Sequence, residues 1–309
     1  MRTGRFLGVV VLLCVSGVTG VADAYTYDAS DFATEMVEYV KGSDVGSHWI
    51  TGETYDNALA ALGRPTVDTT GDGWFVPLSD LMPVVPVNPP SRAYEIVTIG
   101  NGGSLTVKFD HAVLNDPANP YGLDFTIFSN AFQLGDGVSG WTNGDPADFT
   151  LGSTALMTLA NVWVSQDGVT WHSFDNDPMA GGYAPTLGRV YDTANPDNSL
   201  GTWNLWWGEA TDPTLPIDPD LEPADFTGMT VAGIAQIYGQ SAGGTGFDIG
   251  LLGLGWIQYV RVTDDPNSSA TTEIDAFADV AAVPEPGTTA LVVTAALTVW
   301  AWHRRRRMT

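Results

Sequence analysis

The sequence predicts an all-β protein, built as a single β-sandwich with long loops. Glycine, proline, Asp and Asn interrupt the chain at short intervals, and the segments between them are rich in aromatic and β-branched residues. Several of these segments alternate apolar and polar residues with a period of two, which is typical of half-buried strands. The sole cysteine, Cys14, lies in an apolar segment near the N-terminus, so we expect core burial, without disulfides, to hold the sandwich together.

The first 24 residues have the layout of a secretory signal peptide. Arg2 and Arg5 precede an apolar run over residues 6–21, and Ala22-Asp23-Ala24 places small residues where signal peptidase reads them. A retained anchor needs a longer apolar run of about 20 residues. We therefore expect cleavage after Ala24 and export of residues 25–283 as one passenger domain.

Two short helices are expected early in the passenger domain. Ser30 is a candidate N-cap for a helix over residues 31–40, and residues 56–62 form a second candidate that Gly63 and Pro65 would end.

The clearest strands follow. Alternation predicts strands at residues 104–109, 123–128, 162–164, 169–174, 256–262 and 273–280, with a hairpin turn at Asp167-Gly168. Residues 77–90 and 211–223 contain too many prolines for central strands and are expected to be loops.

The C-terminal residues 284–309 combine three features in a fixed order. Pro284-Glu285-Pro286 is followed by an apolar stretch at residues 288–302 and by the arginines Arg304, Arg305, Arg306 and Arg307. Fifteen helical residues span only roughly 22 Å, but flanking tryptophans and arginines can extend a short transmembrane helix at the interfaces. The arginines favour a cytoplasmic C-terminus, which places the passenger domain outside the cytoplasm.

This C-terminal order resembles the PEP-CTERM sorting signal of Gram-negative bacteria. The resemblance implies processing by an exosortase-like membrane protease and an inner-membrane intermediate on the way to the cell surface. An ordinary C-terminal anchor, which would leave the protein tethered, is the alternative.

The passenger also resembles a domain that recurs in PEP-CTERM proteins and is similar to discoidin or galactose-binding sandwiches. Five segments carry this resemblance, at residues 61–65, 115–125, 164–171, 259–262 and 274–276. It implies a jelly-roll sandwich, in which a structural calcium often joins an early loop to the last strand, and it makes Asp275 a candidate ligand.

Charge and residue usage exclude several classes of function. The chain has a net charge of −24, so nucleic acid and anionic lipid are poor partners. Among the few histidines there is no zinc-hydrolase spacing, and no Gly-x-Ser-x-Gly elbow is present. Asp68 and Asp72, four residues apart in a glycine-rich segment, are candidate calcium ligands with Asp275, or else belong to a solvated turn.

Aromatic residues are the remaining candidates for binding. Trp203, Trp206 and Trp207 are close together in sequence, and Trp74 and Trp141 occur in Gly/Asp-rich segments that we expect to be loops. Exposed tryptophans could stack on extracellular polysaccharide, or they could fill the core.

The sequence therefore favours an exported, non-enzymatic protein of the cell surface or extracellular matrix. The alternatives are a carbohydrate-binding module and a polysaccharide-active enzyme.

Overall fold

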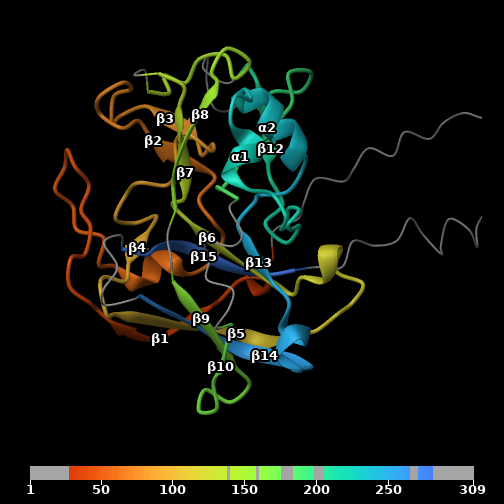
Figure 1. Ribbon diagram of the computed structural model, residues 1–309. Helices are drawn as coiled ribbons and strands as arrows, with labels where there is room; N and C mark the ends of the chain where they lie inside the picture. The colour runs from red at the N-terminus through yellow and green to blue at the C-terminus, as the bar shows by residue number, and fades with distance from the viewer. Residues whose placement is uncertain are drawn as a thin grey trace, which may run out of the picture.

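The computed structural model describes residues 28–137, 140–157, 160–174, 184–197, 205–264 and 271–280. Within them the protein is mostly β-sheet with few helices, which confirms the all-β prediction (Figure 1). The predicted signal peptide and the predicted C-terminal sorting segment, with Ala22, Ala24, Pro284, Glu285, Pro286 and Arg304 to Arg307, lie outside the described residues. No helix in the described ranges is long and apolar enough to span a bilayer.

Most of the chain's regular structure consists of short strands. The strands are β1 (Glu35–Val40), β2 (Asp68–Thr70), β3 (Leu81–Pro83), β4 (Val97–Thr98), β5 (Ser104–Leu114), β6 (Phe125–Ser129), β7 (Phe132–Gly135), β8 (Leu151–Leu156), β9 (Asn161–Ser165), β10 (His172–Ser173), β11 (Arg189–Tyr191), β12 (Trp207–Ala210), β13 (Thr245–Phe247), β14 (Trp256–Thr263) and β15 (Glu273–Asp279). Within the described residues, the helices are α1 (Pro223–Phe226), α2 (Val231–Tyr238) and four 3-10 turns at Ala29–Asp31, Ala58–Ala61, Pro120–Gly122 and Ile249–Leu252.

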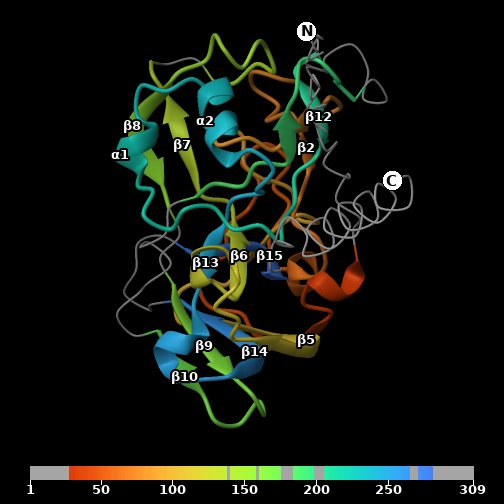
Figure 2. The same ribbon diagram turned by 90° about the vertical axis from the view of Figure 1, so that its right-hand side faces the viewer.

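Two sheets pack face to face in the lower half of Figures 1 and 2. One has the order β1-β5-β14-β9-β10 and the other β13-β6-β15-β4, with every pairing antiparallel. Their inward side chains form one buried cluster that includes Leu105, Val107 and Phe109 of β5 and Phe125 and Ile127 of β6. The apolar residues that alternate in the sequence of β5 and β6 therefore lie on the strand faces that form this core.

The four-stranded sheet is buried on both faces. All five residues of β6 are buried, and Phe128 points away from the sandwich core into a small cluster with Phe32, Ala276 and Ala278. Beyond that face lies what we call the upper lobe, made of β2, β3, β7, β8, β11, β12, α1 and α2 (Figure 2). The upper lobe has a hydrophobic core of its own, which includes Trp207, Phe226 and Ile234. The loops expected from sequence thus fold into a second packed layer.

The helix predicted over residues 31–40 is wrong. Ala29–Asp31 forms a 3-10 turn, and β1 then pairs with β5 at the edge of the sandwich. A bulge lies between Met36 and Glu38, so Met36 and Tyr39 both pack on the core although they are three residues apart. A strand with a bulge therefore reproduces the apolar spacing of a helix. The second predicted helix, over residues 56–62, is a shorter 3-10 turn at Ala58–Ala61.

Other predictions agree closely with the structure. Strands are present at each of the six alternating segments, and Asp167-Gly168 forms the turn between β9 and β10, with Gly168 at φ 73°. β14 and β15, adjacent in sequence, belong to different sheets. Two elements were not predicted. One is helix α2, and the other is the short strand β3, which lies within the segment 77–90 that was expected to be a loop.

Candidate functional site

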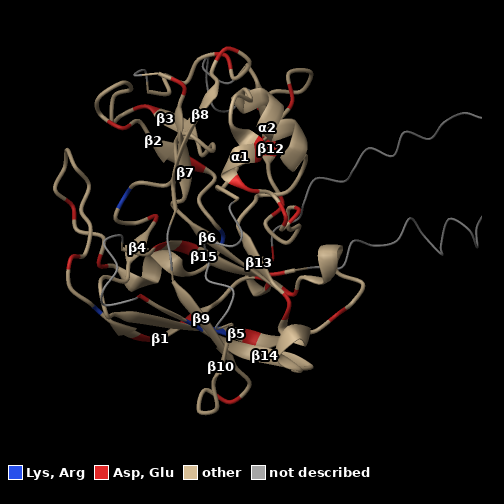
Figure 3. Cartoon of the chain, in the orientation of Figure 1, with Lys and Arg blue, Asp and Glu red and all other residues tan. Residues whose placement is uncertain are grey.

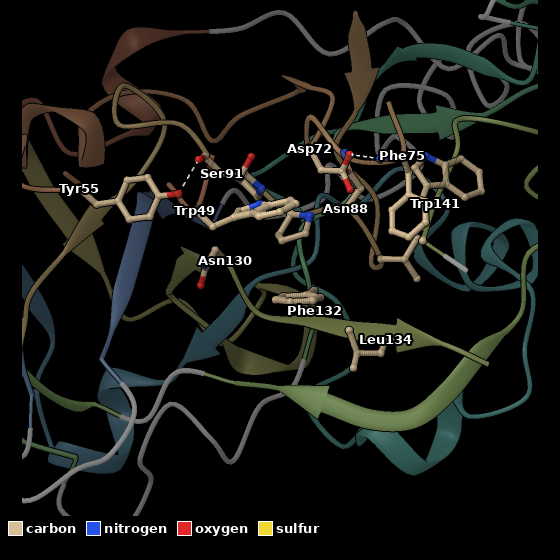
Figure 4. Close-up of a pocket in the computed structure, with 14 residues that line it drawn as sticks. Trp49, Tyr55, Asp72, Phe75, Asn88, Ser91, Asn130, Phe132, Leu134 and Trp141 are labelled. Atoms are coloured by element: carbon tan, nitrogen blue, oxygen red, sulfur yellow. Dashed lines mark hydrogen bonds between the residues drawn. The ribbon is translucent and has the colours of Figure 1, made fainter. Parts of the chain in front are cut away.

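A cleft of about 320 Å³ lies where loops of the upper lobe meet the edge of the sandwich (Figure 4). Its volume is within the range of small-ligand sites, about 300–1,000 Å³. Aromatic and apolar side chains dominate the wall, with a few polar groups among them. The lining residues are Trp49, Tyr55, Asp72, Phe75, Val87, Asn88, Pro89, Pro90, Ser91, Asn130, Phe132, Leu134, Gly140 and Trp141.

Strand β7 supplies one side of the cleft. Phe132 and Leu134 line it, while Gln133 between them is buried on the opposite face, as the period of a strand requires. The Gln133 amide donates hydrogen bonds to the Pro223 carbonyl at 3.3 Å and to the Thr227 hydroxyl at 3.2 Å, and it also contacts the Gly152 carbonyl. This polar anchor fixes β7 against α1 and β8 and thereby holds the apolar wall in place.

A tight turn over residues 48–54 carries Trp49. The Nδ1 atom of His48 accepts hydrogen bonds from the backbone N–H groups of Ile50 (3.3 Å) and Thr51 (3.2 Å). Burial lowers the pKa of His48, so the neutral ring that can accept these bonds is favoured. Trp49 itself is 60% exposed at the mouth of the cleft. The buried histidine therefore holds an exposed aromatic ring in place.

A second turn, over residues 72–76, carries Trp74 and Phe75. The Oδ1 atom of Asp72 accepts the backbone N–H groups of Trp74 (2.9 Å), Phe75 (2.8 Å) and Val76 (3.1 Å). Gly73 has φ 77°, a conformation that glycine adopts without strain. Trp74 is 72% exposed, and its ring centroid lies 5.7 Å from that of Trp49. The two turns thus present adjacent exposed tryptophans.

The two turns also contact each other. A Cβ at Gly73 would lie 2.7 Å from Cδ1 of Ile50, which shows how closely the turn of Trp49 packs on that of Trp74. Phe75 in turn packs over Gly140, where a Cβ would lie 2.1 Å from Cδ2 of the ring. The aromatic wall therefore depends on glycine at both positions.

Polar groups converge at one end of the cleft, to the left in Figure 4. The Tyr55 hydroxyl donates to the Ser91 carbonyl at 2.8 Å, and the Asn130 amide donates to the half-buried Glu273 carboxylate. Burial raises the pKa of Glu273. Figure 4 shows Trp49 and Phe132 on opposite sides of the cavity and Trp141 toward its other end. A ligand in the cleft would meet ring faces on its flanks and amide or hydroxyl groups at one end.

The predicted calcium ligands have separate protein partners. Asp68 forms a bidentate pair with Arg189, at 2.6 Å and 2.5 Å, and Asp72 caps its own turn. Asp275 accepts the backbone N–H of Thr66 at 2.8 Å and its hydroxyl at 2.9 Å, and burial raises the pKa of Asp275 to about 8. Among the described residues, no three His, Cys, Asp or Glu side chains are grouped to hold a metal ion. The structure therefore does not bring the three carboxylates into one site.

Of the predicted stacking residues, Trp206 and Trp207 do not line the cleft. Trp207 is fully buried in the upper-lobe core, where its ring lies edge-on to Tyr191 at 5.9 Å, so it has no free face for a sugar. Trp206 packs partly buried against the same core, and Trp203 lies outside the described residues. Trp207 is part of the upper-lobe core, and the composition of the sequence alone did not reveal that this second core exists.

Trp74 and Trp141, recognised in sequence only as loop aromatics, are instead at or beside the cleft. Trp141 lines it while remaining 5% exposed, and its ring meets Phe149 edge-on at 5.4 Å. Trp49 was missed, although its position among turn residues between Gly46 and Gly52 was an available signal.

Comparison with protein-family models gave no match, and comparison with curated proteins gave none.

Proposed function

We propose that the protein is a non-enzymatic, exported protein of the cell surface or extracellular matrix that binds polysaccharide in this cleft. The observation that carries the proposal is the pair of exposed tryptophans, Trp49 and Trp74, each presented by a turn with a polar brace beside an aromatic cavity. Large exposed apolar groups on a strongly acidic protein need a reason, and a binding site supplies one.

The chemistry of the lining fits a sugar. The C–H faces of a pyranose ring pack on aromatic rings, while its hydroxyl groups need hydrogen-bond partners at the edges. Trp49, Phe75 and Phe132 offer ring surface, and Asn88, Asn130 and Ser91 offer polar groups within the same cavity.

The lining favours binding over hydrolysis. Glycosidases typically use two carboxylates on either side of the scissile bond. Among the described lining residues the only carboxylate is that of Asp72, and its Oδ1 already accepts three backbone N–H groups. This geometry supports a binding site with one anionic edge.

Export and sorting complete the proposal. The two-sheet sandwich, with five strands in one sheet and four in the other, supports the galactose-binding-like fold that the sequence segments imply. We propose that signal peptidase removes residues 1–24 and that an exosortase-like protease processes the tail near Pro284 to Pro286. Intact mass and cell fractionation test this: loss of both ends, with the tail retained when Arg304 to Arg307 are replaced, supports it. A full-length C-terminus in the inner membrane would instead indicate a plain anchor.

A glycan array with fluorescently labelled protein tests the binding function. Trp49→Ala and Trp74→Ala should each weaken binding to any retained glycan at least tenfold. Trp256→Ala is the matched control, because Trp256 is also exposed, at 38%, but lies on β14, outside the cleft lining. Retention of no glycan, or equal effects of all three variants, would reject the proposal.

A further inference from the structure

We infer that the cleft holds an internal stretch of an uncharged, linear glycan, with sugar units in two adjoining cavities. This inference rests on the proposed function and specifies its ligand. It follows from the shape of the site and from the charges around it.

A second cavity, of about 250 Å³, adjoins the first. Both cavities open to solvent, and they share Phe75, Val87, Leu134, Gly140 and Trp141. The second cavity adds Gly135, Gly137 and Phe149. Because the two cavities share five lining residues, they adjoin, and we treat them as two compartments of one site.

Ring surfaces are present along the whole length of this site. Trp49 stands at one end, Trp141 and Phe75 lie in the shared wall, and Phe149 lines only the second cavity. Gly135 and Gly137 of the second cavity have no side chains, so the chain beside these rings is bare backbone. A single monosaccharide would leave part of this surface unused, whereas a chain would cover all of it.

The charges around the site select against acidic glycans. Within the described part of the chain, neither Lys nor Arg lines either cavity, and Asp72 is the only charged lining residue. Arg92, next to the lining residue Ser91, has its guanidinium paired with Glu53 at 2.8 Å. The whole chain carries a net charge of −24. A uronate or sulfate would therefore meet the Asp72 carboxylate on a protein of net negative charge, and no described lining residue is a cation that could bind it.

The test uses isothermal titration with length series, from monosaccharide to hexasaccharide, of glucans, galactans, mannans and N-acetylglucosamine, with oligogalacturonides as the charged series. For the neutral series that binds, affinity should rise at least tenfold from monosaccharide to the longer oligomers. Phe149→Ala should remove most of this rise and should reduce the affinity for long oligomers more than the affinity for the shortest binding oligomer, because Phe149 lines only the second cavity but also packs against Trp141 of the shared wall. Phe149→Leu is the milder variant if the alanine variant does not fold.

The control separates this inference from the proposed function. Trp49→Ala should weaken every length, because the first compartment is used by all of them. Asp72→Asn keeps an oxygen that accepts the backbone N–H groups and removes the negative charge. It should therefore reduce the difference in affinity between neutral and uronate chains. Length-independent binding, or preference for oligogalacturonides, would overturn the inference while leaving carbohydrate binding intact. Absence of binding in all series would reject both.

Discussion

Replacing Asp275 with asparagine should separate the cost of a buried carboxylate from the benefit of its hydrogen bonds. Burial raises the pKa of Asp275 from 3.8 to about 8, and the Glu95 carboxylate adds to the rise, while the hydrogen bonds from Thr66 oppose it. The folded protein thus keeps a proton that the unfolded chain releases near pH 4. The free energy of unfolding contributed by this group is full below about pH 4 and falls as the pH rises to about 8.

The magnitude follows from the pKa shift. About four pH units at ~1.4 kcal/mol per unit correspond to ~6 kcal/mol across the window. Asparagine has the shape of the protonated acid, keeps an oxygen for the Thr66 N–H and does not titrate. Between pH 4 and pH 7, the unfolding free energy of Asp275→Asn should therefore gain ~4 kcal/mol relative to the unmodified protein.

Guanidinium unfolding followed by tryptophan fluorescence, at several pH values with EDTA, measures this difference. The same series in calcium provides the control. A variant that is less stable by the same amount at every pH would refute the reasoning. If calcium also stabilised only the unmodified protein, Asp275 would be an ionised ligand, as the resemblance to galactose-binding sandwiches implies.

Three further predictions concern the cleft and the second core. Acidification below pH 6.5 should weaken glycan binding, because protonation of the buried His48 removes the acceptor for the backbone N–H groups of Ile50 and Thr51. Since burial lowers the pKa of His48 in the folded protein, the stability that neutral His48 gives to the turn is full above pH 6.5 and is lost as the pH falls toward that lowered pKa. His48→Asn, which keeps an acceptor, should flatten the pH profile of binding measured by titration, and an unchanged profile would contradict the role of His48. Gly140→Ala should displace Phe75, cost ~1–3 kcal/mol and weaken binding, whereas Gly144→Ala, whose Cβ meets nothing nearer than 3.6 Å, should do neither. Trp207→Ala should cost ~3–5 kcal/mol in thermal unfolding without changing glycan affinity below the transition, and a selective loss of affinity would restore Trp207 as a binding residue.

Strand β5 of the sandwich was predictable because it has one apolar row that faces the core. Leu105, Val107 and Phe109 give that signal with no interruption, and β5 is where the alternation placed a strand. β1 was misread because its bulge moves Met36 and Tyr39 to a helical spacing. Residues 35–40 form a strand because they pair with β5, and the local sequence carries no information on that pairing.

Helix α2 was predictable but was overlooked. Thr230 caps it, Gly239 ends it, and Val231, Ile234, Ala235 and Tyr238 are buried at helical spacing. The cleft was not predictable in the same way. Its walls come from the turns at 48–54 and 72–76, from β7 and from the segment around Trp141, and no periodicity connects these four segments. Sequence could mark single aromatic residues in loops, but only the packing of Ile50 on Gly73 and of Phe75 on Gly140 brings them together.

The burial of the four-stranded sheet on both faces limits how this protein can be truncated or fused to another protein. A fragment consisting of the sandwich alone would expose Phe32, Phe128, Ala276 and Ala278 to water and would aggregate through that surface. The cleft of the proposed function therefore needs the sheet beneath it and cannot be transferred to another protein without that sheet. Insertions and fusion tags are better placed at the tip of the β9–β10 hairpin, where Val169 is exposed and Figure 3 shows the loop projecting below the body of the protein.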